Sequence, residues 1–438
     1  MTSIEIGWLA IAGLLALIAL GMPIALGMLL VSFLGVVLIR SDAVAVRMIG
    51  SVANDALREY LYAIVPLFVL MGLLVSASGV GKDTFDVFER LLRRVRAGLG
   101  VATVFANAVF AAITGVSIAS ATVFARVAVP EMTRHGYTRR FATGVVAGSS
   151  VLGMLIPPSL LMIVYAVLAE QSVGRMFLAG VGPGLVLSAA FTVTILLLAW
   201  RRPGFVFETG ESQGAPERDL GALDIARKGM PIVTLIVLVL GGIYSGFLNP
   251  TEAGAVGAFG ALMLALARRS LTGGAFWRLL VETGQITVSV LVLIMAATFF
   301  SRMLAMSGLP NMLARELLAG PIGPTGFLIL YLALVIVLGF LLDSISIMLI
   351  LLPIVLPIAQ AAQFDLIWFG VMTVIAVEIG LLTPPFGLSV YTIKSALDDG
   401  TLRVSEIFRG AFPFVLTMIA VLAIIGLFPG IATWLARL

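Results

Sequence analysis

The sequence predicts an all-α polytopic membrane protein built from two inverted repeats, each with five transmembrane helices and one re-entrant hairpin. Three observations lead to this fold class: the composition, a series of long apolar stretches, and residues that recur at one fixed offset. Of the 438 residues 61% are hydrophobic and only 11% are charged, whereas an average soluble domain is about 25% charged. With a mean hydropathy of +1.15, the chain lacks the polar surface of a soluble enzyme or disordered chain.

The apolar stretches are continuous, which favours helices over the alternating strands of a membrane β-barrel. A bilayer core of roughly 30 Å requires about 20 apolar residues per helix. No Lys or Arg precedes Arg40, so the first stretch lacks the basic start of a signal peptide and is predicted to be a retained helix. The predicted spans are 4–20, 24–39, 61–78, 141–169, 176–200, 231–248, 251–267, 281–307, 366–393 and 411–428.

Two further apolar regions, 99–132 and 325–361, are too long for one span and are interrupted by small polar residues. The interruptions run from Thr114 to Ser120 and from Leu342 to Ser346. Irregular backbone at membrane depth persists only where protein or a water-filled cavity covers it. We therefore expect two re-entrant hairpins with polar tips; the alternative is a long helix with a polar kink. The segments 80–97 and 309–319, which precede the hairpins, are expected to be interfacial amphipathic arms or solvated loop helices.

The span that follows each hairpin contains two adjacent prolines, Pro157 and Pro158 in one and Pro384 and Pro385 in the other. Each proline removes a backbone donor and clashes with the preceding turn. We therefore predict that 141–169 and 366–393 are broken helices with free backbone groups inside the membrane.

Both proline pairs belong to a repeat with an offset of 227 residues. The recurring pairs are Pro23 and Pro250, Gly27 and Gly254, Ser117 and Ser344, Pro130 and Pro357, Gly153 and Gly380, Pro157 and Pro384, and Pro158 and Pro385. The offset divides the chain into a first repeat (1–200), a linker (201–229) and a second repeat (230–438). Because five crossings per repeat is an odd number, the second copy is inverted, as in many secondary transporters.

The distribution of basic residues predicts the orientation. Four arginines between 90 and 96 and three between 134 and 140 flank the first hairpin, whereas the second has only Arg315 with Glu316, and later Asp365. The linker contains five basic residues, including Arg218. By the positive-inside rule, the linker and the entry of the first hairpin are cytoplasmic, and both termini lie outside.

Hairpin tips and broken helices of such repeats meet near the membrane midplane, where substrate and coupling ions bind. Helix N-termini there attract an anionic group, and free carbonyls with Ser or Thr hydroxyls suit Na⁺. The first repeat supplies Thr114, Gly115, Ser117, Ser120, Gly153, Pro157 and Ser159. The second repeat supplies Asp343, Ser344, Ser346, Gly380, Thr383, Pro384 and Gly387.

Intramembrane carboxylates are costly and often functional. Asp343 and Glu378 have Val116 and Val151 as their offset partners, so the acids break the repeat symmetry. We expect them to make the second ion site more anionic or to bind a proton; the alternative is a carboxylate satisfied by a helix end or an arginine. With no cysteine and one histidine (His135), no catalytic or transition-metal site is expected, and no P-loop indicates an ATP motor.

The run from Ala112 to Thr122, the break from Gly153 to Ser159 and its echo from Leu382 to Gly387 resemble the large membrane subunit of tripartite ATP-independent periplasmic (TRAP) transporters. The resemblance covers essentially the whole chain. It implies an elevator-type, Na⁺-driven importer of small organic acids in the bacterial inner membrane, with Na⁺ between each hairpin tip and the neighbouring broken helix. It also implies two separate partners, a small four-helix membrane subunit and a periplasmic substrate-binding protein.

Two alternatives remain open from the sequence. One is a single-subunit ion or dicarboxylate transporter of related architecture, which would act without partners. The other is a membrane-embedded enzyme, which would need a cluster of acid–base or metal-binding residues.

Overall fold

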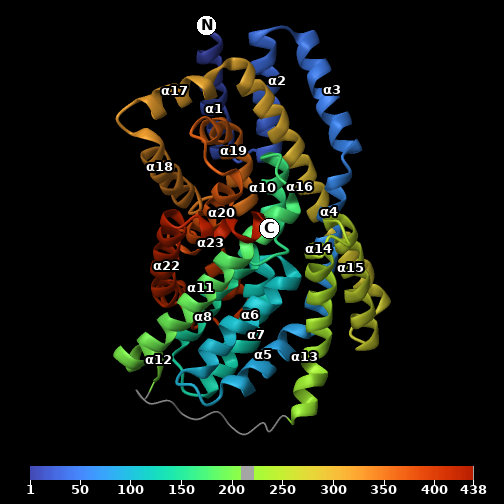
Figure 1. The fold of residues 1–438 in the computed structure, drawn as a ribbon, viewed down its shortest axis with the longest axis vertical. Coiled ribbons are helices and arrows are strands. Elements are labelled where there is room, and N and C mark those ends of the chain that lie inside the picture. The colour runs from blue at the N-terminus through green and yellow to red at the C-terminus, as the bar shows by residue number, and fades with distance from the viewer. Residues whose placement is uncertain (209–220, 438) are drawn as a thin grey trace.

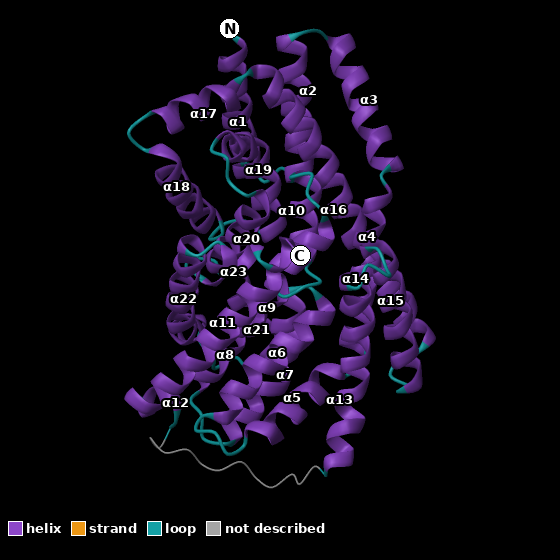
Figure 2. Ribbon diagram, in the orientation of Figure 1, coloured by secondary structure: helices purple, strands orange, loops and turns teal. Residues whose placement is uncertain are grey.

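The computed structural model describes residues 1–208 and 221–437, so part of the predicted linker, including Arg218, lies outside the described residues. The described residues form helices connected by turns and loops, and their one β-type contact is an isolated bridge between Tyr137 and Phe207. Figures 1 and 2 show helices that lie mostly along the long axis of the molecule. The protein is a multi-pass membrane protein, because several of its helices are long and apolar enough to cross a bilayer.

The first part of the chain forms thirteen helical segments. These are α1 (Ser3–Ala19), α2 (Ile24–Ile39), α3 (Asp42–Arg58), η1 (Tyr60–Ala63), α4 (Ile64–Ala77), α5 (Val80–Leu92), α6 (Gly98–Thr114), α7 (Ser117–Arg134), α8 (Arg139–Ser150), α9 (Leu152–Leu155), α10 (Leu160–Leu168), α11 (Val173–Arg201) and α12 (Pro203–Val206).

The described residues after the linker form another thirteen segments. These are α13 (Ala222–Ile236), η2 (Val237–Gly241), α14 (Gly242–Tyr244), α15 (Pro250–Ala267), α16 (Gly273–Ser307), α17 (Leu309–Ala319), α18 (Gly323–Leu338), α19 (Ser344–Ala361), α20 (Leu366–Leu382), α21 (Leu388–Leu397), α22 (Val404–Leu427), α23 (Gly430–Thr433) and η3 (Leu435–Arg437).

Nine of the ten predicted spans fall on apolar helices or on a bent helix pair, whereas 231–248 is divided among α13, η2 and α14 and does not qualify as a span. Six helices in the described part of the chain are long and apolar enough to cross a membrane, or up to eight if each of two bent helix pairs counts as one span. One of these pairs is α8–α9 with α10, bent by 41° at the first double proline. Helices α1, α2 and α20 are apolar but only 16–17 residues long, so the total of ten full spans stays a prediction. The sequence analysis missed α3, because it is amphipathic rather than uniformly apolar.

Helix boundaries recur at the same offset as the sequence motifs. Helix α7 shifted by 227 residues gives the bounds of α19, and α10 shifted in the same way overlaps α21. Equivalent pairs of helices also make equivalent contacts: α8 packs against α22, and α20 packs against α11. The second half of each broken helix packs against the second helix of the other hairpin, α10 on α19 and α21 on α7.

The two arms both pack against the rest of the protein. Helix α5 buries Val80 and Phe85 and contacts α6 and α13. Lys228 of α13 forms ion pairs with Asp83 and Asp86 of α5, and Arg268 also binds Asp83. Helix α17 buries Leu309 and Pro310 and contacts α19 and α18. The arms are therefore docked helices and not solvated loops.

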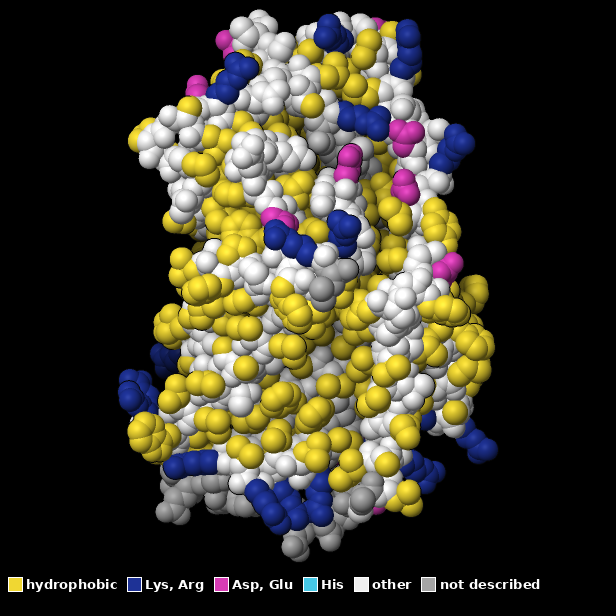
Figure 3. Space-filling view, in the orientation of Figure 1, with side chains coloured by type: hydrophobic (Ala, Val, Ile, Leu, Met, Phe, Trp, Pro, Cys, Tyr) yellow, Lys and Arg dark blue, Asp and Glu magenta, His cyan; other side chains and the backbone are white. Residues whose placement is uncertain are grey.

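Figure 3 shows a broad apolar surface across the middle of the molecule. Lys and Arg side chains gather at the lower end, near α12 and the start of α13, whereas most Asp and Glu side chains visible on this face lie in the upper half. Such an apolar band between charged ends is the surface that a bilayer covers.

Candidate functional site

The tip of the first hairpin is packed into the first helix break. The chain turns at Gly115 and Val116, and the Leu160 backbone N–H donates to the Gly115 carbonyl at 3.2 Å. Gly115 has a φ of +65°, and a Cβ atom there would lie 2.4 Å from the Pro158 carbonyl oxygen. A Cβ atom on Gly153 would lie 3.0 Å from the Ser117 backbone nitrogen. The tip and the break therefore form one closely packed unit that requires glycine at both contacts.

Most polar side chains in this unit have protein partners. The Ser120 hydroxyl donates to Asn107 Oδ1 at 2.8 Å, and Asn107 Nδ2 donates to the Ser149 hydroxyl at 2.6 Å. This chain joins both arms of the hairpin to α8. Sequence reasoning missed Asn107, although an amide in an apolar helix was a usable signal.

Two other predicted site residues stabilise helix ends. Ser159 caps α10 by accepting a hydrogen bond from the Met162 N–H at 3.3 Å, and its own hydroxyl donates to the Met154 carbonyl at 2.5 Å across the break. Thr114 donates to the Phe110 carbonyl at 3.0 Å. Pro157 is buried beside them. The Ser117 hydroxyl is fully buried beside the carboxyl of Glu378 on α20.

The second hairpin turns between α18 and α19, and its tip is held by Asp343. The Asp343 carboxylate accepts hydrogen bonds from the backbone N–H groups of Ile345 and Ser346, each at 3.2 Å, and from the Ser346 hydroxyl. It is the N-cap of α19 and is solvent-exposed, with Ser344 buried beside it. The Asp343 carboxylate therefore has helix-end partners, and its part in an ion site stays a prediction.

The second helix break lies beside this tip. A Cβ atom on Gly380 of α20 would come 2.7 Å from Gly339 Cα, so the helix approaches the hairpin backbone directly. Thr383 ends α20 and donates to the Ile379 carbonyl at 2.7 Å. Gly387 begins α21 with a φ of +48°. Pro384 is exposed, unlike Pro157 in the first break.

Glu378 lies on α20, with only 1% of its surface exposed. Its carboxyl is next to the Ser117 side chain of the first hairpin. The sequence associated Glu378 with the second ion site, but the helix turns it toward the first. Residues two apart in a helix point in nearly opposite directions, so Gly380 faces the second hairpin while Glu378 faces the first.

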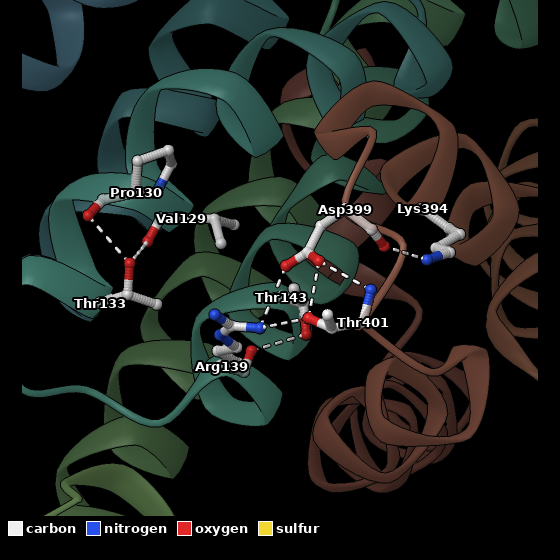
Figure 4. Close-up of polar contacts among 8 residues, drawn as sticks. All are labelled: Val129, Pro130, Thr133, Arg139, Thr143, Lys394, Asp399 and Thr401. Atoms are coloured by element: carbon white, nitrogen blue, oxygen red, sulfur yellow. Dashed lines mark hydrogen bonds and ion pairs between the residues drawn. The ribbon is translucent and has the colours of Figure 1, made fainter.

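An ionic contact joins the two repeats at the end of the molecule that carries the basic residues. Figure 4 shows Arg139, at the start of α8, beside Asp399, in the loop after α21. Arg139 donates to the Asp399 carboxylate at 3.0 Å and to the Thr401 hydroxyl at 2.9 Å. The Thr401 hydroxyl and backbone N–H hydrogen-bond the same carboxylate and, with Arg139, lower the pKa of Asp399. The Lys394 ammonium binds the Asp399 carbonyl.

A cavity of about 880 Å³ lies at the opposite end, between α3, η1 and α16 on one side and α10 and α19 on the other. Its only basic lining residue within the described chain is Arg302, which forms an ion pair with Asp55 at 3.0 Å. Glu59, Glu170 and Gln360 also line the cavity.

Chemically, each tip brings together helix ends of both polarities. At the first tip the C-terminal ends of α6 and α9 meet the N-terminal ends of α7 and α10, and at the second α20 packs against the C-terminal end of α18 and against α19. Unpaired carbonyls at helix C-termini attract cations, and N–H groups at N-termini attract anions. In residues 1–208 and 221–437 no group of three or more His, Asp or Glu side chains is placed to hold a metal ion.

Comparison with known protein families gives a match over most of the chain. The sequence model described as "Tripartite ATP-independent periplasmic transporter, DctM component" matches residues 11–431. The chain belongs to this family. It is therefore a transporter permease component and not an enzyme, and the sequence-based assignment to the TRAP large subunit is confirmed.

Several curated members of the TRAP family are similar over most of their length. The C4-dicarboxylate TRAP transporter large permease protein of Pseudomonas aeruginosa is 32% identical, and the match covers 89% of each chain. The sialic acid TRAP transporter large permease protein of Vibrio cholerae is 30% identical, with 96% of each chain covered. The 2,3-diketo-L-gulonate large permease protein of Escherichia coli is 29% identical over 95% of each chain.

Among solved structures, the YdaH transporter of Alcanivorax borkumensis has a similar fold. Its TM-score is 0.61, and the match covers 89% of this chain and 87% of that chain. The sequences are only 14% identical, so the likeness concerns the fold alone.

Proposed function

We propose that this TRAP large permease imports a small organic acid across the bacterial inner membrane, coupled to Na⁺, and receives its substrate from a periplasmic binding protein. The main support is the pair of hairpin tips, each placed against a broken helix with free helix ends of both polarities. Na⁺ suits the carbonyl and hydroxyl oxygens there, and the carboxylate of a substrate suits the N–H groups. The named substrates of three similar permeases are C4-dicarboxylates, sialic acid and 2,3-diketo-L-gulonate, all of them acids.

An elevator motion of inverted repeats is the proposed mechanism. The cross-repeat contacts of α10 with α19 and of α21 with α7 join both tips and both breaks in one body. The arms α5 and α17 connect that body to α4 and α16, and the basic end of the molecule faces the cytoplasm by the positive-inside rule. Na⁺ binding would order the tips and offset local charge before this body moves inward.

Two separate partners are proposed, a small membrane subunit and the binding protein. The isethionate permease protein DctMQ of Oleidesulfovibrio alaskensis is longer than this chain, which matches 64% of its length. The extra length of such a relative leaves room for a further subunit fused to the large one. We propose that the binding protein releases its substrate near the cavity that contains Arg302, at the end opposite the basic residues.

Uptake into liposomes tests the proposal. The chain is reconstituted with and without the products of neighbouring genes, and a panel of radiolabelled organic acids is offered under an inward Na⁺ gradient or with choline in its place. Uptake that requires both Na⁺ and the partners is the expected result. Uptake unchanged in choline would exclude Na⁺ coupling, and uptake by the chain alone would indicate a single-subunit transporter.

A further inference from the structure

Glu378 is the most unusual polar group in the described part of the protein. Both of its carboxyl oxygens are fully buried, the polar side chain beside them is Ser117, and Glu378 takes part in no ion pair within residues 1–208 and 221–437. Buried polar groups nearly always have partners, and an unpaired carboxylate at membrane depth is especially costly. A group of this kind indicates a ligand that the protein chain itself does not supply.

Two buried hydroxyl groups lie on helices around Glu378. The Ser117 hydroxyl is fully buried beside the Glu378 carboxyl. Ser389 of α21 is also fully buried with an unpaired hydroxyl. Arg126 of α7 donates to the Ala396 carbonyl of α21 at 3.3 Å. Ser389 and Ser117 both lie in the first turn of their helices, α21 and α7, and these two helices pack against each other.

These groups come from both repeats. Ser117 belongs to the first hairpin, whereas Glu378 and Ser389 belong to the two halves of the second broken helix. The last carbonyls of α6, which have no partner within their helix, end at the same tip. Oxygen atoms of hydroxyl, carbonyl and carboxylate groups are the ligands that hard cations prefer.

We propose that Glu378 supplies the negative charge of a monovalent-cation site shared by the first hairpin tip and the second broken helix. Ser117 is a neutral oxygen ligand of this site. This inference rests on the proposed Na⁺ coupling. It places the carboxylate that binds the ion, Glu378, at the first tip instead of the second. One carboxylate balances one monovalent ion, and because the ligands come from both repeats, the bound ion holds the repeats together.

Thermal unfolding of the purified protein in detergent tests this site without transport. A cation that binds the folded state raises the midpoint of unfolding with its concentration. We would titrate NaCl against choline chloride at constant ionic strength for the wild type, Glu378→Gln and Glu282→Gln. Glu282 is an exposed carboxylate on α16 and serves as the matched control. Removing one charge from a buried site is expected to raise the half-maximal Na⁺ concentration about tenfold or more, with no change in Glu282→Gln.

The outcomes separate this inference from the proposed function. If the wild type shows no stabilisation specific to Na⁺, both are overturned. If the wild type is stabilised and Glu378→Gln responds to the same Na⁺ concentrations, Glu378 is a neutral buried acid, and only this inference is overturned.

Ser117→Ala keeps the test decisive if Glu378→Gln does not fold. This variant retains the carboxylate and removes one neutral ligand, so it should weaken the response to Na⁺ while leaving the unfolding midpoint in choline close to that of the wild type. An unchanged Na⁺ response in Ser117→Ala would also overturn the proposed site.

Discussion

The two hairpin tips occupy equivalent places in the repeat but differ in how closely the protein covers them. Thr114 at the first tip is 2% exposed, whereas Leu341, 227 residues later, is 63% exposed. Helices α6 and α7 pack along each other, but α18 and α19 barely touch. The hydrogen bond from Leu160 to Gly115 has no equivalent from Gly387 to Leu342 in the described structure. A repeated sequence pattern thus supports one closed and one open tip.

The difference follows from the residues that approach each tip. Gly72 of α4 brings its helix against the Thr114 carbonyl, and the buried chain through Asn107 joins α6, α7 and α8. At the second tip Leu341 and Phe386 point away from the protein. The first tip is therefore a rigid part of the core, and the second is the accessible one. Four predictions test this contrast, beginning with the largest expected effect.

Replacing Gly115 at the first tip by alanine should destabilise the protein more than replacing Gly387 at the second helix break. Gly115→Ala forces a Cβ atom against a backbone carbonyl in a left-handed conformation, which alone costs about 1–2 kcal/mol. Gly387 also has a positive φ of +48°, so Gly387→Ala carries a similar conformational cost, but its Cβ meets the Phe408 ring, a side chain that can move. We expect Gly115→Ala to lower the unfolding midpoint strongly and to abolish uptake, and Gly387→Ala to retain a folded protein. Equal losses of stability would contradict the contrast.

Cysteine labelling measures the exposure of the tips directly, because the chain contains no cysteine. Leu341→Cys should react with a membrane-impermeant maleimide at least about tenfold faster than Thr114→Cys, since a thiol must reach solvent to react. The comparison uses detergent-solubilised protein, so that both sides of the membrane are accessible. Equal labelling rates would show that the first tip opens as readily as the second.

Removing the helix cap at the second tip should have a moderate effect. Asp343→Ala leaves the first N–H groups of α19 without their acceptor and should cost about 1 kcal/mol of unfolding free energy. Asp365→Ala removes the comparable cap of α20, which lies away from the tips, together with a solvent-exposed ion pair to Arg437, and is the control. Both variants should lose similar stability, but only Asp343→Ala should also alter Na⁺-dependent uptake. An identical effect on uptake would show that Asp343 is only a cap.

The smallest effect is expected at the ionic contact between Arg139 and Asp399. The pKa of Asp399 is lowered from 3.8, mainly by the Thr401 hydroxyl and N–H groups and further by Arg139. A lowered pKa in the folded state means that the charged form stabilises the protein above the ordinary pKa. This stabilisation is lost as the pH falls through the lowered value.

Asp399→Asn should therefore lower the unfolding midpoint slightly near neutral pH, and its difference from the wild type should disappear as the pH falls below 3.8 and through the lowered pKa. Unfolding midpoints measured from neutral to acidic pH test this. A difference that grows on acidification would assign the contact another role.

Much of the fold was predictable from local patterns. Double prolines break helices wherever they occur, and runs of apolar residues form membrane helices, so the breaks after Gly153 and Gly380 and the turns near Ser117 and Ser344 were visible in the sequence. The family followed from the same motifs. Asn107 was overlooked within an apolar run, and α3 was overlooked because its hydrophobic residues cover only one face.

The sequence by itself determined the class of protein, the repeat and the segments that form the tips, because these depend on composition and on backbone restrictions that act locally. Only the tertiary structure decided which groups meet at each tip. The direction in which Glu378 points depends on the rotation of α20, which the contact of Gly380 with Gly339 sets. The same packing decides that one tip is closed and the other open, because burial arises from helices far apart in the chain.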